Sequence, residues 1–324
     1  WECADQIGLR HVVPENRVRL YDMREIIKTI ADIDSVLEIR KLFGAGMITA
    51  FIRIEGKPMG VIANNPHHLS GAIDSAGADK GARFMKLCDA FDIPILSLMD
   101  CPGLMVGPQV EATGLVRHSA RMFNAGANIT TPLFGVVVRK AYGLGIQAMC
   151  GGSSLMGLLT IAWPTAEFAA MNIEGSVKLG FRKELEAIES AEARQQLCKE
   201  KVEEQYELSK AVNAASGGGI DDVIDPSETR SWIAEGLKRL PPRPPRSQYG
   251  EFATGAVAAA LAEVEHRRVV ELRSDGLVAA ARPHKRRYLR GDHHVVPGGL
   301  CTGLKRRQCG GFACTRPTRQ RHRD

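Results

Sequence analysis

Two short apolar runs, each next to a helical pattern, constrain the fold of this chain more than any other feature. Residues 94–99 read Pro-Ile-Leu-Ser-Leu-Met, and residues 133–138 read Leu-Phe-Gly-Val-Val-Val. Runs of this length with almost no polar residues are typical of strands buried on both faces. Helical patterns follow them at about 112–124 and 145–150. Strands that alternate with helices predict an α/β fold with a mostly parallel sheet covered by helices.

More elements are expected on both sides of this centre. Residues 47–54 and 59–63 are β-rich runs, and the intervening Glu-Gly-Lys-Pro is typical of a hairpin turn. Residues 78–91 have helical periodicity, and residues 182–215 read as one long charged helix. Two more strands are expected over 158–163 and 167–171.

The organisation changes near residue 241. A short helix with a capped start at Asp225-Pro226 is expected to end near Leu240, where a Pro-Pro-Arg-Pro-Pro sequence begins. We therefore predict one domain over residues 1–245 and an appended segment over 246–324. That segment is expected to hold an Ala-rich helix and then a basic, disordered tail.

Charge is unevenly distributed along the 324 residues, although the net value is only +6. Residues 281–324 hold twelve Lys or Arg and two Asp or Glu, which gives +10 and leaves about −4 for the rest. The tail has few aromatic residues for stacking on bases, so no specific nucleic-acid partner is expected. Its Cys301, Cys309 and Cys314 match no standard zinc spacing, so we predict no metal site.

The cysteines and the hydropathy suggest where the protein works. Five of the eight cysteines are isolated and mostly lie in apolar stretches, which is typical of reduced thiols in the cytoplasm. No run of 18 apolar residues is present, so we expect no membrane association. The chain opens at Trp1 without a Met. We therefore expect it to be part of a longer protein.

The segment after the second apolar run carries the most chemical information. Tyr142-Gly143-Leu144-Gly145 follows a buried strand and opens a helix. Such a turn can leave the amides of Leu144 and Gly145 unpaired and pointing outward. Two convergent amides form an oxyanion hole, which stabilises developing negative charge. An ordinary strand-to-helix turn is the alternative, because Gly-x-Gly alone is a weak signal.

Six motifs in register extend this hypothesis. The motifs are Tyr21-Asp22-Met23-Arg24, Ala63-Asn64-Asn65-Pro66, Ala82-Arg83-Phe84 with Cys88-Asp89-Ala90-Phe91, Asp100-Cys101-Pro102-Gly103, Arg139-Lys140-Ala141-Tyr142-Gly143, and Ala162-Trp163-Pro164-Thr165-Ala166-Glu167. In these motifs, over roughly residues 1–245, the chain resembles the C-terminal half of the carboxyltransferase β subunit of biotin-dependent acyl-CoA carboxylases, of the propionyl-CoA and methylcrotonyl-CoA type.

The resemblance implies a crotonase-like ββα spiral and a specific reaction. Leu144 and Gly145 would stabilise negative charge on the ureido oxygen of biotin. The biotin site would be lined by Tyr142, Gly143, Gly103 and Gly114. Carboxybiotin on a carrier would release CO2, the freed biotin nitrogen would take the α-proton of the acyl-CoA, and the enolate would attack CO2. No side chain need act as the base.

The same resemblance implies partners and leaves the substrate open. The half of such proteins that binds acyl-CoA would come from another domain or chain, within an oligomer that also engages the biotin carrier and biotin carboxylase. Short-chain members have Asp where Gln147 stands, and many have Gly-Gly-Ala where this chain has Gly-Leu-Gly. The acyl group is therefore undetermined.

Other functions compete with this interpretation. Glu167 could serve a crotonase-type enoyl-CoA hydratase, and Asp100 could form an acid–base pair with His118 if the fold brings them together. His67-His68 is expected to be solvated rather than metal-binding. Asp-Cys-Pro-Gly at 100–103 resembles a GTPase motif, but no phosphate-binding loop accompanies it. An inactive assembly or binding fragment, with the helix over 182–215 packing between subunits, is the non-enzymatic alternative.

Overall fold

A computed structural model describes residues 1–241 of the chain. They form an eight-stranded sheet in the order β1-β2-β3-β4-β5-β6-β8, in which β7 also pairs with β5. The β1–β2 and β2–β3 pairs are antiparallel, and every other pair is parallel. The strands are β1 (Leu37–Ile39), β2 (Met47–Ile54), β3 (Lys57–Asn64), β4 (Ile95–Cys101), β5 (Leu133–Tyr142), β6 (Leu159–Ala162), β7 (Glu167–Ala169) and β8 (Asp222–Val223).

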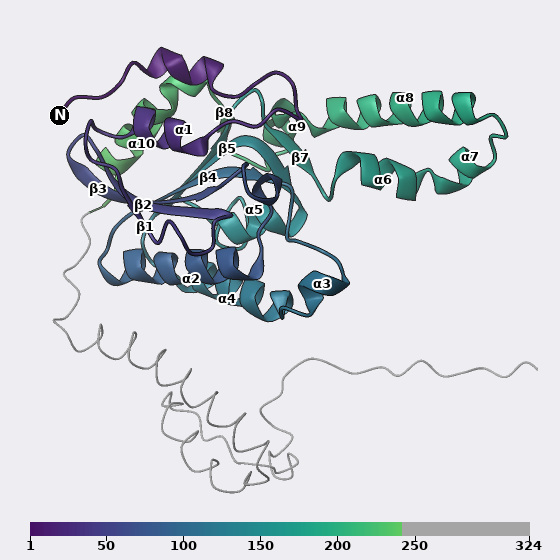
Figure 1. Cartoon of the computed structure of the whole chain (residues 1–324). Helices are drawn as coiled ribbons and strands as arrows, with labels where there is room; N and C mark the ends of the chain where they lie inside the picture. Colours follow the sequence, from purple (N-terminus) through teal and green to yellow (C-terminus); the bar gives the residue numbers. More distant parts are fainter. Residues whose placement is uncertain (242–324) are drawn as a thin grey trace, which may run out of the picture. The chain divides into compact units, whose positions relative to one another are not determined.

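Helices cover both faces of the sheet, as Figure 1 shows. On one face, α2 and α4 pack over a core that contains Phe84, Met99 and Met122. On the other face, α1 and α10 pack over a core that contains Ile26 and Trp163. The helices around the sheet are η1 (Gln6–His11), α1 (Met23–Ile30), η2 (Leu69–Gly71), α2 (Ser75–Ala90), α3 (Pro108–Glu111), α4 (Leu115–Asn128), α5 (Gly143–Met149), α9 (Ala211–Ser216), η3 (Pro226–Glu228) and α10 (Thr229–Lys238).

The predicted α/β class with a mostly parallel sheet is therefore confirmed. All seven residues of β4 are buried, as expected for a strand covered on both faces. The expected hairpin at 47–63 is β2 and β3, joined at Glu55 and Gly56. The capped start near Asp225 is also present, since its side chain accepts a hydrogen bond from the amide of Ser227.

The prediction of one long helix over 182–215 is wrong. The segment forms three helices, α7 (Arg182–Glu186), α8 (Ala191–Ser209) and α9. Ser190 caps the start of α8 by accepting a hydrogen bond from the amide of Ala193. The backbone of Lys210 is extended and forms an antiparallel β-bridge with the backbone of Glu167 in β7. This backbone contact with the sheet ends α8.

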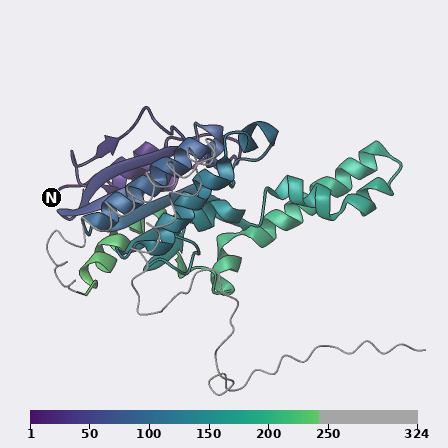
Figure 2. The same ribbon diagram turned by 90° about the horizontal axis from the view of Figure 1, so that it is seen from below.

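The helices α6 (Ile173–Gly180), α7 and α8 form a structure that we call the helical hairpin. It projects away from the sheet in both views of the molecule (Figures 1 and 2). Its base packs on Tyr142 at the end of β5, through a cluster that includes Ile173 and Tyr206. Any contact made at the base therefore lies next to the turn that the sequence singled out.

Within residues 1–241, no helix is long and apolar enough to cross a membrane. The predicted boundary at residue 245, the Ala-rich helix, the basic tail and the three cysteines of that tail lie outside the described residues.

Candidate functional site

The turn predicted to carry the chemistry lies at the carboxyl end of β5. Tyr142 ends the strand, and Gly143 begins α5 with φ of +52°. Only glycine adopts this left-handed conformation without strain. A Cβ on Gly143 would also lie 2.6 Å from the carbonyl oxygen of Ala170. Backbone conformation and packing therefore both require glycine at the first position of the turn.

The second glycine of the turn packs against the loop that follows β4. Gly145 is buried, and a Cβ on it would lie 2.5 Å from Cys101 Sγ and 2.9 Å from Gly103 Cα. Gly103 has φ of +130°, so it too occupies a conformation that favours glycine. The two predicted site residues Gly103 and Gly145 thus meet, although 42 positions of sequence separate them. A side chain at residue 145 would push the two loops apart.

The amides of Leu144 and Gly145 lie in the first turn of α5. The first N–H groups of a helix have no partner within it. Among the described residues, no backbone carbonyl outside α5 accepts a hydrogen bond from either amide. The side chain of Tyr142, the residue before α5, does not cap the helix. Leu144 is 54% exposed. The geometry therefore permits two adjacent donors at this edge of the sheet.

Gly114 stands in a different setting from the other predicted glycines. It precedes α4 with φ of +72°, and a Cβ there would have only atoms of the His118 ring within 4 Å. Its glycine is explained by the start of the helix. A role for Gly114 in the wall of the biotin site stays a prediction.

Tyr142 and Glu167 form a buried pair beside the turn. The Tyr142 hydroxyl donates to Glu167 Oε2 at 2.8 Å, and Arg17 Nε lies 2.8 Å from Glu167 Oε1. Burial and the Glu167 charge raise the pKa of Tyr142, so the phenol stays protonated. Both carboxylate oxygens of Glu167 are therefore engaged. This arrangement does not leave Glu167 as the base that an enoyl-CoA hydratase would need.

The proposed acid–base pair of Asp100 and His118 does not form. Asp100 is fully buried and pairs with Arg139, whose Nη2 lies 2.9 Å from Asp100 Oδ2. His118 pairs instead with Asp79, at 2.7 Å between Nδ1 and Oδ2. The sequence could not reveal this, because α2 supplies Asp79 and α4 supplies His118.

The His67-His68 pair, which was expected to be solvated rather than metal-binding, makes one side-chain contact within the protein. His68 Nε2 lies 3.3 Å from Asp74 Oδ2. Within residues 1–241, no group of three His, Cys, Asp or Glu side chains is arranged to hold a metal ion.

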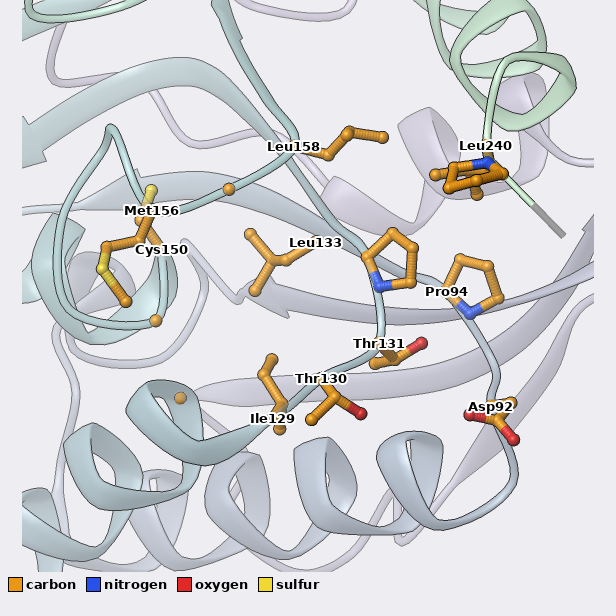
Figure 3. A pocket seen from close by; sticks show the side chains of 15 residues that line it. Asp92, Pro94, Ile129, Thr130, Thr131, Leu133, Cys150, Met156, Leu158 and Leu240 are labelled. Atoms are coloured by element: carbon orange, nitrogen blue, oxygen red, sulfur yellow. The ribbon is translucent and has the colours of Figure 1, made fainter. Parts of the chain in front are cut away.

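A cavity of about 450 Å³ lies at the opposite edge of the sheet (Figure 3). Its wall includes Pro94, Leu133 and Leu158, which lie at or next to the amino ends of β4, β5 and β6. Because β5 has ten residues, up to roughly 30 Å of strand separates this cavity from the Tyr142 turn. The cavity is therefore distinct from the candidate site.

A family comparison is consistent with this geometry. Residues 2–244 match the model of the carboxyl transferase domain. The chain belongs to the carboxyl transferase domain family. The crotonase-like fold that the resemblance implied is thereby confirmed.

Two curated relatives show what the chain is similar to. It is 39% identical over 255 residues to the methylmalonyl-CoA carboxyltransferase 12S subunit of Propionibacterium freudenreichii, covering 78% of this chain and 48% of the relative. It is 39% identical over 245 residues to the propionyl-CoA carboxylase beta chain of Saccharopolyspora erythraea, covering 73% and 44%. The chain therefore spans about half the length of these relatives.

Solved structures give the same picture. A transcarboxylase 12S structure, described as a hexamer with methylmalonyl-coenzyme A bound, aligns with a TM-score of 0.68 at 37% identity. That alignment covers 77% of this chain and 48% of the other. A single-chain, multi-domain long-chain acyl-CoA carboxylase aligns with a TM-score of 0.67 at 47% identity, over 72% of this chain and 24% of the other.

Proposed function

We propose that this chain is the biotin-side half of a carboxyltransferase, which transfers a carboxyl group from carboxybiotin to the α-carbon of an acyl-CoA. The observation that carries the proposal is the contact between Gly145 and Gly103, which fixes the Leu144 and Gly145 amides at the carboxyl end of β5. In open α/β sheets, ligands bind outside the carboxyl ends of the strands. Membership in the carboxyl transferase domain family supports this choice of reaction.

The two amides would donate hydrogen bonds to the ureido oxygen, where negative charge develops during transfer. Donors held in place before the reaction stabilise such charge at no cost in reorganisation. Carboxybiotin, when bound, supplies the carboxyl group. Its ureido ring requires donors rather than a metal or a basic side chain, and this turn fits that requirement.

The surrounding side chains support a site without a protein base. Glu167 is engaged by Tyr142 and Arg17, and Asp100 is engaged by Arg139. Each of these carboxylates is paired within the protein. The backbone amides are therefore the groups we assign to the reaction.

The chain would work with partners. Because it spans about half the length of its curated relatives, we propose that an acyl-CoA-binding half from another domain or chain completes the site. We also propose a biotin carrier with its biotin carboxylase, an oligomeric assembly, a module boundary at residue 245, and a reducing cytoplasm for the free thiols. The acyl group is left open.

A reconstituted transfer assay tests the function. The full chain is mixed with the separately expressed acyl-CoA-binding half of a relative, a carrier bearing ¹⁴C-carboxybiotin, and propionyl-CoA or a longer acyl-CoA. Label on the acyl-CoA supports the proposal. Hydration of crotonyl-CoA in the absence of biotin, together with no label transfer, would instead establish a hydratase.

Replacing Gly145 with Val tests the site itself. The added side chain would separate the loops at Cys101 and Gly103, and we expect transfer to fall about 10²-fold. Gly180→Val is the matched control, because a Cβ at Gly180 meets nothing within 4 Å. Circular dichroism confirms that both variants fold, and the milder Gly145→Ala is used if Gly145→Val does not. An unchanged rate in a folded variant would remove these amides from the mechanism.

A further inference from the structure

The pairing of β4 with β5 is irregular immediately before the turn. The strands are in register up to Met99 and Val137, and the next pair is Cys101 with Ala141. Asp100 on β4 therefore faces three residues of β5, numbers 138–140. Such bulges leave groups of the sheet ladder unpaired, and they often lie next to active sites. Before the bulge β5 pairs with β6, and from Lys140, the last residue of the bulge, β5 pairs with β7.

The carboxylate of Asp100 satisfies the groups that the bulge exposes. Its Oδ1 accepts a hydrogen bond from the Lys140 amide at 3.1 Å. Its Oδ2 accepts from Arg139 Nε at 3.1 Å, with Nη2 at 2.9 Å. The Val138 carbonyl, left over on the same bulge, accepts from the Thr165 hydroxyl at 2.6 Å. One backbone donor of the bulge, the Lys140 amide, and one backbone acceptor, the Val138 carbonyl, are thus held by side chains.

Arg139 and Tyr21 extend this network to the N-terminal segment. Arg139 Nη1 donates to the carbonyls of Arg17 and Arg19, at 3.3 and 2.9 Å. The Tyr21 hydroxyl donates to Asp100 Oδ2 at 3.0 Å. Burial and the Asp100 charge raise the pKa of Tyr21, so the phenol keeps the proton that it donates. The side chains of Asp100 and Arg139 are 0% and 4% exposed, so water cannot replace these bonds.

Both loops of the candidate site start at this network. Gly103 follows Asp100 by three residues, and Gly143 follows Lys140 by three residues. These two loops then meet where Gly145 packs on Gly103. A shift of the Asp100 carboxylate would therefore displace both partners of that contact at once.

We infer that Asp100 is a positioning residue, which sets the position and direction of the Leu144 and Gly145 amides through its hydrogen bonds to the β5 bulge. The inference rests on the proposed function for its effect on catalysis. Asp100 itself does not touch a substrate in this scheme. It acts through Lys140 and Arg139 on the turn.

Two double variants separate positioning from charge. Asp100→Asn with Arg139→Gln removes both charges but keeps an acceptor for the Lys140 amide. Asp100→Leu with Arg139→Met removes both charges and the acceptor. Neither leaves the charge of Asp100 or Arg139 unpaired, and replacing a buried ion pair by apolar side chains of similar size is often tolerated. Both variants equally remove the carboxylate that lies 3.7 Å from Lys140 Nζ. The pair of variants therefore differs mainly in the hydrogen bonds to the bulge.

Each double variant is made in the full chain and measured in two ways. The first is kcat and KM for carboxyl transfer in the reconstituted assay. We expect the Leu/Met variant to lose about 10²-fold in kcat, as for an oxyanion donor that is out of place, with KM for acyl-CoA unchanged. The Asn/Gln variant should stay near the parent value. The second is amide hydrogen exchange of residues 139–145 without substrate, which should be faster only in the Leu/Met variant.

The two measurements test the inference and the proposed function separately. Parent-like kcat and parent-like exchange in the folded Leu/Met variant would overturn the inference and leave the proposed function intact. Faster exchange in that variant, with no transfer by the parent chain, would overturn the proposed function and leave the positioning role. If the Leu/Met variant does not fold, Tyr21→Phe decides. It removes one bond to Asp100 Oδ2, and unchanged exchange together with unchanged kcat overturns the inference.

Discussion

Two regions of the molecule contain different kinds of ion pair: the sheet with its covering helices, which we call the body, and the helical hairpin. In the body, Arg230 on α10 pairs with Asp32 after α1, and their side chains are only 8% and 7% exposed. In the hairpin, Arg182 pairs with Glu186 one turn later, and those side chains are 69% and 63% exposed. The body has exposed pairs of near neighbours as well, such as Lys28 with Glu25. Its buried pair joins segments far apart in sequence, whereas Arg182 and Glu186 of the hairpin are near neighbours in water.

This difference separates what fixes the site from what surrounds it. Removing one partner of a buried pair leaves an uncompensated charge, whereas an exposed pair is screened and contributes little. The candidate site lies at the carboxyl end of β5, inside the body. The hairpin contacts that site through its base, where Tyr206 and Ile173 pack on Tyr142.

Replacing Arg230 with Met should have the largest effect on stability. Asp32 also accepts hydrogen bonds from the amides of Glu55 and Gly56, so its charge would remain buried without its cation. We expect the free energy of unfolding to fall by about 3–5 kcal/mol, measured by urea unfolding. Adding Asp32→Asn should restore part of the loss. A loss below about 1 kcal/mol would mean that the body does not depend on its buried pairs, and the contrast with the hairpin would disappear.

The same contrast explains what could be predicted from the sequence. Runs such as residues 94–99 and 133–138 dictate buried strands by composition alone, so the α/β class and the turn at Tyr142 followed from local pattern. The partners of Asp100 did not, since Tyr21 and Arg139 lie far from it in the chain. The available signal was a charged residue at the end of each of two apolar runs, at Asp100 and Arg139.

The prediction of one helix over residues 182–215 was wrong because local pattern favours a continuous helix there. Good helix formers continue through residues 182–215, and local propensity alone gives no break. Ser190 was the one local signal of a new helix start, because serine caps helices. The break at Lys210 comes from its bridge to Glu167 of the sheet, which is a contact that no local pattern contains.

Alkaline unfolding should distinguish the two regions through their thiols. Burial raises the pKa of Cys88, Cys101 and Cys150 from 9.0 to about 12. Between these pH values the three thiols stay protonated in the folded chain but lose their protons in the unfolded chain. Their contribution to the free energy of unfolding is therefore constant below pH 9 and falls as the pH rises toward 12. Each thiol contributes at most about 1.4 kcal/mol per pH unit.

Urea unfolding at pH 8, 9 and 10 measures this slope in the parent and in two variants. Cys88→Ala removes one buried thiol and should make the slope shallower. Cys198→Ala, in α8 of the hairpin, is the control for replacing a cysteine by alanine at a partly buried position. Equal slopes in the parent and in Cys88→Ala would show that burial in the body does not govern this titration.

Replacing Arg182 with Ala should have the smallest effect of these changes. The variant removes the pair with Glu186 and changes a residue in the first position of α7, where a cation gives no benefit from the helix dipole. Exposed pairs spaced by four residues contribute about 0.3–0.5 kcal/mol, so the free energy of unfolding should change by no more than that. Glu186→Ala breaks the same pair from the other side and should agree within error. A loss above about 1 kcal/mol in both variants would mean that this exposed pair contributes more than pairs of its spacing usually do. The contrast between the buried pair of the body and the exposed pair of the hairpin would then be weaker than we propose.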